Sequence, residues 1–297
     1  MSIVKVSNLR KKYGKFTALD RINLEVNRGE IYGFIGPNGA GKTTTIRIML
    51  GILKATGGKA EIFGLDAWKD AVEIHKKVAY VPGEVNLWPN LTGGETIDLF
   101  VKLRGSNNKS RRDELIERFD LDPSRKCRTY SKGNRQKVAL IAAFASDADL
   151  YILDEPTSGL DPLMENVFQE CVREAKQEGK SIFLSSHILS EVEKLCDKVS
   201  IIRQGKIIET GTLEELRHLT RTSIFVQTKE TIPALNELKG VHDIEEKDNS
   251  IYFQVDTEEL ANVIKYISQF EILKLESAPP TLEDLFMRHY KGEAGEV

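Results

Sequence analysis

The sequence predicts an α/β protein with a mainly parallel sheet, followed by a smaller α+β domain. In roughly the first 220 residues, short apolar segments alternate with segments whose apolar residues recur at helical spacing. Strands separated by helices are typical of a parallel sheet covered by helices. Beyond this point the expected order becomes βαββαβ, which is typical of a small split-βαβ, ferredoxin-like domain. We therefore expect two domains, 1–220 and 221–297.

Composition limits the classes of protein that are possible. The chain has 297 residues, of which 40% are hydrophobic and 29% charged, as in an ordinary globular protein. Its net charge of −3 gives no sign of the basic field of a general nucleic-acid binder, so no nucleic-acid partner is expected. The longest apolar run, 138–145, is far shorter than the roughly 20 residues of a membrane span.

Two features of the sequence bear on the location of the protein: its cysteines and its first residues. Cys127, Cys171 and Cys196 lie far apart and suggest neither a metal site nor a disulfide framework. The first residues lack the basic and apolar stretches of a signal peptide. We expect a cytoplasmic protein with reduced cysteines.

The first domain contains the expected elements in this order. Extended segments cover 3–9 and 22–26, and a third at 30–35 leads through a glycine-rich turn into a helix over 43–53. Helices over 95–103 and 111–121 fall in a helical subdomain at about 85–145. The remaining elements are strands at 150–153 and 181–184, a helix over 163–179 between them, and a hairpin of 199–202 with 206–209.

The second domain is shorter and has its own pattern. We expect strands at 224–227, 244–246, 251–255 and 272–275, with helices over 232–238 and 260–270. Pro279 and Pro280 then interrupt the chain before a short amphipathic helix over 282–290.

Residues 36–43 read GPNGAGKT and match the phosphate-binding loop pattern at every fixed position. Glycines let the backbone amides turn toward phosphate oxygens, and the following helix directs its positive end at the same anion. Lys42 would reach the β- and γ-phosphates and the Thr43 hydroxyl would bind Mg²⁺. The nucleotide-binding residues expected here are Gly36, Asn38, Gly39, Gly41, Lys42, Thr43 and Thr44.

Two acids supply the second half of a Mg²⁺–ATP site. The apolar run 150–153 ends in Asp154 and Glu155, which places both at the carboxyl end of a buried strand, where α/β sheets bind ligands. Asp154 would hold Mg²⁺, and Glu155 would orient or deprotonate the attacking water. A solvated turn is the alternative for such a pair considered alone.

Three further strings carry a family resemblance. Residues 130–136 (YSKGNRQ) resemble the signature sequence of the ABC ATPases, 158–161 (SGLD) resemble the loop after their paired acids, and 185–187 (SSH) resemble their switch histidine. From about residue 3 to 219 the chain resembles the ATP-binding subunit of a drug- or antibiotic-export ABC transporter. Within that group it is most similar to ATPases of polyketide-antibiotic exporters. The resemblance implies the P-loop NTPase fold of an ABC ATPase domain, with an antiparallel β part and a helical subdomain.

The resemblance also implies a partner and several roles. Two copies would sandwich two ATP molecules, so that Ser131 and Gly133 of one copy cover the γ-phosphate held by Lys42 of the other. His187 would contact the γ-phosphate and Asp161 would couple the two sites, although a structural histidine is the alternative for His187. Two other expected nucleotide contacts are Asn134 of the signature string and Tyr13, which would stack on adenine unless it is a core tyrosine.

The chain departs from the family pattern at one loop. Gly83 stands where the family has a glutamine that touches Mg²⁺, and Glu84 follows it. We expect either that Glu84 substitutes as a metal ligand or that water makes this contact. Lys132 and Asn134 also replace the usual glycine and glutamine of the signature.

Three functions fit these features. The first is the motor of an exporter, peripheral on the inner face of the membrane and bound to a separate permease. The second is a soluble ABC ATPase that acts in translation or on DNA. The third is an ATP-dependent regulatory module. An intact Glu155 favours turnover, and the chain has neither a second cassette nor a coiled-coil insertion. The second domain is an accessory or regulatory one, with a structural brace as the simplest role.

Overall fold

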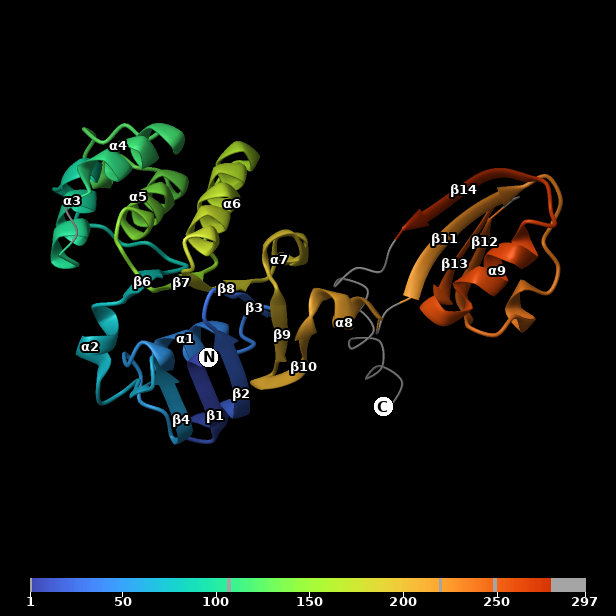
Figure 1. Cartoon of the computed structure of the whole chain (residues 1–297), viewed down its shortest axis with the longest axis horizontal. Helices are drawn as coiled ribbons and strands as arrows, with labels where there is room; N and C mark the ends of the chain where they lie inside the picture. Colours follow the sequence, from blue (N-terminus) through green and yellow to red (C-terminus); the bar gives the residue numbers. More distant parts are fainter. Residues whose placement is uncertain (1, 106–107, 219–220, 248–249, 279–297) are drawn as a thin grey trace. The chain divides into compact units, whose positions relative to one another are not determined.

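The structure, a computed structural model, describes residues 2–105, 108–218, 221–247 and 250–278 (Figure 1). The chain divides into two compact units, Met1–Thr210 and Gly211–Val297, and each is described by itself. This division falls earlier than the expected 220, within β10 (Lys206–Thr212), and α8 (Leu213–His218) follows that strand directly. The helix expected over 282–290 lies outside the described residues.

A six-stranded sheet forms the centre of the first unit. Its strand order is β10-β9-β3-β8-β7-β6, and the pairs from β9 to β6 are parallel. Every residue of β3, β7 and β8 is buried, which explains their continuous apolar character. The prediction of a mainly parallel sheet is confirmed. The strands β3, β6, β7, β8 and β9 of this sheet cover Ile31–Ile35, Val78–Val81, Leu150–Asp154, Ser181–Ser186 and Lys198–Arg203.

A second, antiparallel sheet packs against the same core. Its order is β2-β1-β4-β5, with β1 at Ser2–Tyr13, β2 at Phe16–Asn27, β4 at Gly57–Ile62 and β5 at Leu65–Asp66. Buried side chains of both sheets form one cluster with those of helix α1 (Lys42–Met49), among them Ile22, Ile46 and Phe183. This packing fixes α1, and with it the loop that precedes it.

Helix α1 is shorter than the expected 43–53. Gly51 has a φ of +65°, and the amides of Ile52 and Leu53 both donate to the carbonyl of Arg47. The chain therefore turns out of the helix after Met49, which apolar spacing alone did not reveal.

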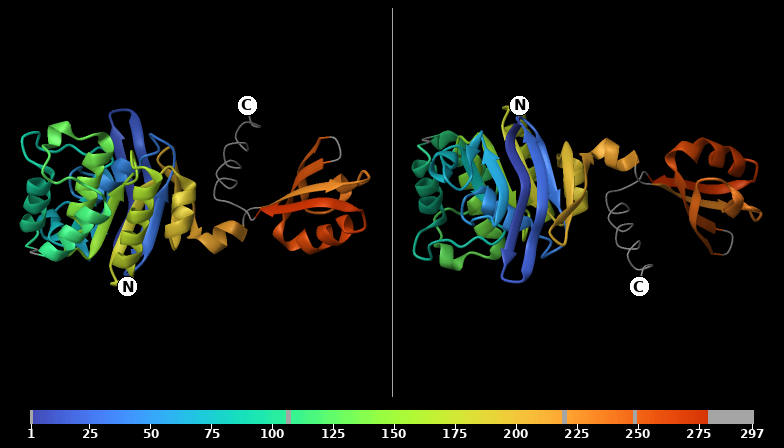
Figure 2. Two further views of the ribbon diagram at one scale, coloured as in Figure 1. Left: turned by 90° about the horizontal axis from the view of Figure 1, so that it is seen from above. Right: turned by 90° about the horizontal axis from the view of Figure 1, so that it is seen from below.

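The expected helical subdomain consists of α3 (Gly93–Leu103), α4 (Lys109–Arg118) and α5 (Lys132–Phe144), which lie together at one end of the first unit (Figure 2). Thr92 and Glu95 begin α3 with a reciprocal capping box. Arg111 and Arg118 of α4 form ion pairs with Glu174 of α6 (Pro162–Gln177), at 2.7 and 2.8 Å. The other helices of this unit are α2 (Ala71–His75) and α7 (Leu189–Leu195).

No helix in the described parts of the chain combines the length and apolar character that a membrane span requires.

The second unit is a four-stranded antiparallel sheet of order β12-β13-β11-β14. This is the strand order of the predicted ferredoxin-like domain. Its apolar core contains Ile224, Phe253 and Val263. The elements are β11 (Arg221–Thr228), β12 (Val241–Lys247), β13 (Ser250–Asp256), α9 (Leu260–Ile267) and β14 (Ile272–Ala278).

The helix expected over 232–238 is wrong. Only a single 3₁₀ turn, Leu235–Glu237, forms there. Ala234 adopts a left-handed backbone with a φ of +51°, so a regular helix does not run through it. The apolar spacing fits a helix and does not reveal this interruption.

Candidate active site

The glycine-rich loop lies between β3 and α1, and two of its glycines are required by close contacts. A Cβ added at Gly36 would lie 2.2 Å from the carbonyl oxygen of Ile202. Gly41 has a φ of +115°, and a Cβ there would lie 2.6 Å from Leu19 Cδ2. The loop therefore curls against β9 and β2 in a conformation that only glycine fits at these positions. The cradle of backbone amides is expected within this loop.

The side chain of Lys42 contacts the backbone of the loop. Its side chain is only 6% exposed, and its Nζ donates to the carbonyl oxygens of Gly36 at 2.6 Å and Pro37 at 3.3 Å. The same Nζ lies 3.0 Å from Oε1 of Glu155. A buried ammonium group therefore faces both the loop and the end of β7, where it can attract an anion.

Asp154 lies at the carboxyl end of β7, with 1% of its side chain exposed. It accepts hydrogen bonds from Thr43 Oγ1 at 2.9 Å and from the Ser185 hydroxyl of β8. Carboxylate and hydroxyl oxygens are the ligands that Mg²⁺ prefers. The donor set of Thr43 and Asp154 thus fits the expected cation.

Glu155 is held in an unusual backbone conformation. Its φ is +49°, and its amide donates to the carbonyl of Ser185 at 3.0 Å. Residues held in this region by their surroundings cluster at functional sites. Its Oε2 forms a hydrogen bond with Nδ1 of His187, whose side chain is 49% exposed. Lys42, Glu155 and His187 therefore form one connected chain of side chains.

Two adjoining cavities meet at these side chains. One, of about 240 Å³, is lined by Tyr13, Phe16, Ala18, Pro37, Asn38, Gly39, Gly41, Lys42, Thr43, Thr44 and Glu155. The other, of about 460 Å³, is lined by Asn38, Thr43, Arg47, Tyr80, Pro82, Gly83, Glu84, Asn86, Asp154, Glu155, Ser158 and His187. Asn38, Thr43 and Glu155 line both. The structure thus gathers the expected loop residues, both acids and His187 around one space.

Phe16, Arg47 and Tyr80 are among the lining residues that the sequence analysis did not assign to the site. Phe16 is the cross-strand partner of Tyr13 in the β1–β2 hairpin, and both rings are exposed, 66% and 49%. A hairpin signal could have paired them. Burial and the nearby charge of Asp154 raise the pKa of Tyr80 to about 12. Arg47 falls in the helix expected after the phosphate loop and Tyr80 lies three residues before Gly83, but the sequence did not indicate that their side chains line a cavity.

The loop that departs from the family pattern lies beside the acids. A Cβ at Gly83 would be 3.3 Å from the carbonyl oxygen of Asp154, which is a tight contact. Glu84 is exposed and lines the same cavity as Thr43 and Asp154. Its carboxylate is therefore available on the side of the cavity where Gly83 has no side chain.

The signature residues lie at a different place. Ser131 caps α5, accepting from the amide of Asn134 at 3.2 Å. Gly133 packs under the loop after β7, where a Cβ would lie 2.4 Å from the carbonyl oxygen of Gly159. None of Ser131, Gly133 and Asn134 lines either cavity around Lys42.

Side chains connect α5 to the loop that follows Glu155. Lys132 Nζ donates to Ser158 Oγ at 2.6 Å, and the buried Gln136 donates to the carbonyl of Pro156 at 2.9 Å. Asp161 caps α6, accepting from the amide of Met164 at 3.0 Å. The signature helix and the acid loop are therefore one connected part of the unit.

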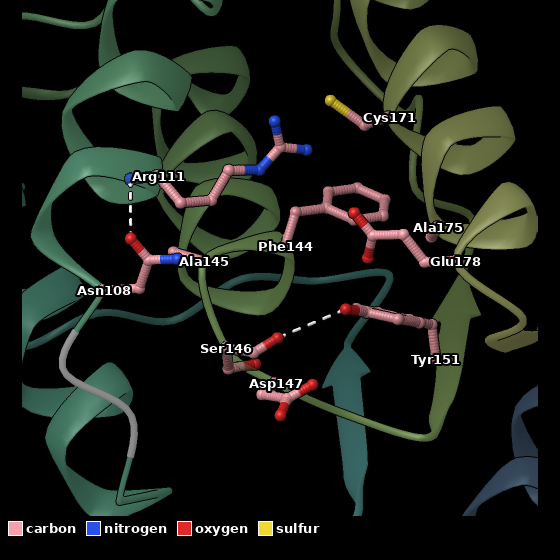
Figure 3. A pocket seen from close by; sticks show the side chains of 10 residues that line it. All are labelled: Asn108, Arg111, Phe144, Ala145, Ser146, Asp147, Tyr151, Cys171, Ala175 and Glu178. Atoms are coloured by element: carbon pink, nitrogen blue, oxygen red, sulfur yellow. Dashed lines mark hydrogen bonds between the residues drawn. The ribbon is translucent and has the colours of Figure 1, made fainter.

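A separate cavity of about 340 Å³ lies among α4, α5, α6 and β7 (Figure 3). It is lined by Asn108, Arg111, Phe144, Ala145, Ser146, Asp147, Tyr151, Cys171, Ala175 and Glu178. Two of its polar side chains are engaged within the protein: Arg111 pairs with Glu174, and the Tyr151 hydroxyl donates to the carbonyl of Ser146 at 3.2 Å. No residue expected at the site lies in it.

Comparisons with known proteins agree with this geometry. A family model described as ABC transporter matches residues 19–158, and one described as ATP-binding protein DrrA1-3-like, C-terminal domain, matches residues 211–290. The chain is 33% identical over 296 residues to the bacitracin transport ATP-binding protein BcrA of Bacillus licheniformis, covering 97% of each chain. It is 30% identical over 304 residues to the linearmycin resistance ATP-binding protein LnrL of Bacillus subtilis (strain 168), covering 96% of this chain and 97% of that one.

Solved structures are similar as well. An ATP binding subunit of an ABC transporter has a TM-score of 0.69 and 33% sequence identity, over 73% of this chain and 92% of that one. The dimeric structure of the bacterial ABC transporter cassette MJ0796 has a TM-score of 0.65 over 71% of this chain and 98% of that one. At 24% identity, this second likeness concerns the fold alone.

Proposed function

Because the chain belongs to the ABC transporter family, as a subunit that binds and hydrolyses ATP, we propose that it powers antibiotic export through a separate membrane permease. The bacitracin transport and linearmycin resistance relatives support this, since they match nearly the whole chain. They favour the exporter over an ATPase of translation or DNA and over a purely regulatory module. The chain would then work in the cytoplasm, peripheral on the inner face of the membrane.

One observation supports this proposal above the others. Five side chains surround the two adjoining cavities: Lys42, Thr43, Asp154, Glu155 and His187. ATP would lie with its phosphates in the loop between Gly36 and Thr44, where backbone amides and Lys42 Nζ face the anion. The exposed rings of Tyr13 and Phe16 at the mouth of the smaller cavity offer flat faces for adenine.

Thr43 and Asp154 would hold Mg²⁺, and Glu84, which lines the same cavity, would add a carboxylate. When bound there, Mg²⁺ neutralises charge on the phosphate oxygens. The buried Asp154 is kept in place by the Ser185 hydroxyl, so its carboxylate needs no rearrangement to act.

Glu155 would orient the attacking water and accept its proton. Its carboxylate lies between Lys42 and His187, so both groups hold it at a fixed place in the cavity. His187, on the exposed side of that carboxylate, would contact the γ-phosphate. Positioning of this kind supplies most of the catalysis in phosphoryl transfer.

The second half of each site would come from another copy of the chain. The capped start of α5, with Ser131, Gly133 and Asn134, lies apart from the cavities around Lys42 and would serve as an anion-binding helix end. In a head-to-tail homodimer it would cover the γ-phosphate held by the other copy. Asp161, in the loop joined to α5 by Lys132 and Gln136, would couple the two sites.

The second unit would be an accessory domain that braces or regulates this dimer. Its match to the C-terminal domain of DrrA1-3-like ATP-binding proteins supports a role specific to this branch of the family. Removal of 223–297 should weaken dimer formation or alter turnover. Unchanged dimerisation and activity would exclude a bracing or regulatory role for this unit.

The export function is tested in a strain from which the gene for this chain has been deleted. We expect the strain to become more sensitive to bacitracin, to linearmycin or to both. The wild-type gene should restore resistance, and a Lys42→Ala gene expressed at the same level should not. If neither sensitivity changes while the purified chain hydrolyses ATP, the chain is an ATPase with another cargo.

A further inference from the structure

A second buried carboxyl group lies beside the site without being part of it. Glu191 belongs to α7, four residues after His187, and only 6% of its side chain is exposed. Buried carboxyl groups are costly unless hydrogen bonds compensate. Burial raises the pKa of Glu191, the charges of Glu165 and Glu155 raise it further, and hydrogen bonds from Thr157 and Ser186 act in the opposite direction. The protein therefore retains a group that its surroundings disfavour as an anion.

Glu191 binds the residue directly before His187. Ser186 Oγ donates to Glu191 Oε2 at 3.1 Å and also accepts from the amide of Ile188 at 2.9 Å. The carbonyl of Ser186 accepts from the amide of Gly36, the first residue of the phosphate loop, at 3.4 Å. The turn that carries His187 is thus tied on one side to the phosphate loop and on the other to Glu191.

Glu191 reaches the site through one oxygen of its carboxyl group. Oε2 holds the hydroxyl of Ser186, whereas Oε1 is buried and has no hydrogen-bond partner among the described residues. His187, the residue after Ser186, is itself joined to Glu155 by a hydrogen bond. One buried carboxyl group therefore holds the turn from which His187 reaches Glu155.

We propose that Glu191 is a positioning residue for ATP hydrolysis, which holds the turn at Ser186 so that His187 keeps its geometry toward Glu155. This rests on the proposed roles of those two residues. Glu191 lines neither of the two cavities around Lys42 and would act through His187. Because a misplacement of about 1 Å in such a site can cost roughly 100-fold in rate, loss of this carboxyl should lower turnover rather than ATP binding.

The test compares Glu191→Ala, Glu191→Gln and Lys194→Ala in the full-length chain. Lys194 lies on the same helix and is exposed, so it serves as the matched control. Phosphate release gives kcat and KM for Mg²⁺–ATP, equilibrium binding gives the affinity for ATP, and thermal unfolding shows that each variant is folded. We expect kcat to fall about 10- to 100-fold in Glu191→Ala, with ATP affinity within about threefold of wild type. Glu191→Gln, which keeps a hydrogen-bonding group of the same shape, should stay within about threefold in kcat, and Lys194→Ala should be unchanged.

A double-mutant cycle with His187→Ala separates positioning from general stability. If Glu191 acts through His187, Glu191→Ala should lower kcat much less in the His187→Ala background than in the wild type. Equal losses in both backgrounds, or folded Glu191→Ala with the wild-type kcat, would overturn the proposal. Absence of ATP hydrolysis in the wild-type chain would instead contradict the proposed function itself, so the two failures are distinguishable.

Discussion

His187 Nδ1 and Glu155 Oε2 form a hydrogen bond across the ends of two neighbouring parallel strands, β8 and β7. The two residues are 32 positions apart, so only the pairing of the strands brings them together. Glu155 also lies against Lys42, which leaves His187 as the exposed member of the group. This pair defines where hydrolysis would occur.

His187→Ala should therefore lower kcat about 100-fold while leaving ATP affinity nearly unchanged, because the phosphate loop and Lys42 are untouched. Phosphate release and equilibrium ATP binding measure the two quantities. His75→Ala is the matched control, since His75 bonds only the carbonyl of Leu50 in the described contacts. Wild-type turnover in His187→Ala would exclude the role.

Gly133→Ala should abolish the ATP-induced dimer without preventing one chain from binding ATP. Its Cβ would lie 2.4 Å from the carbonyl of Gly159, so the start of α5 and Ser131 must shift. The matched control is Gly57→Ala, where the nearest atom is 3.7 Å away and φ is not positive. Light scattering with ATP and binding to a single chain are measured together. A normal dimer in Gly133→Ala would show that the start of α5 is not part of the interface.

The sequence predicted those parts of the site that consist of residues close together along the chain. The loop 36–43 and the acids Asp154 and Glu155 follow from a strand, a turn and a helix, and the structure places them together. The roles given to these residues remain predictions.

The contacts that join distant segments could not be predicted. Lys132 meets Ser158 and Gln136 meets Pro156 across 26 and 20 positions. The contact of Glu191 with Ser186, five positions apart, depends on α7 packing back on β8. The helix expected over 232–238 does not form because Ala234 takes a left-handed backbone conformation, although the apolar spacing fits a helix. Sequence spacing reports which face is apolar, whereas these features depend on backbone geometry and tertiary packing.

Glu84→Ala should raise the Mg²⁺ concentration for half-maximal ATPase activity several-fold, because the carboxylate lines the cavity beside Thr43 and Asp154. A Mg²⁺ titration of phosphate release at fixed ATP measures this. Asn86→Ala, which changes an uncharged residue of the same cavity, is the control. An unchanged Mg²⁺ dependence in Glu84→Ala would indicate that water, and not Glu84, makes this contact with the metal.

The three cysteines should resist thiol reagents in the native protein. Cys127, Cys171 and Cys196 are all buried, and burial raises the pKa of Cys171 to about 12 and that of Cys196 as well. At pH 8, well below these values, both thiols remain protonated, and the thiolate is the reactive form. Labelling with a thiol reagent should be slow in buffer and complete in denaturant. Rapid labelling without denaturant would contradict this burial.

The central claim is that ATP binds between two copies of the chain and that Glu155 drives its hydrolysis. The most direct measurement is the mass of Glu155→Gln in solution with Mg²⁺–ATP, determined by light scattering beside the ATPase rate of the wild type. We expect the variant to hydrolyse ATP at least about 100-fold more slowly and to shift from a 33.4 kDa monomer to a dimer of twice that mass. A variant that stays monomeric with saturating ATP, together with a wild type that does not turn ATP over, would contradict the account.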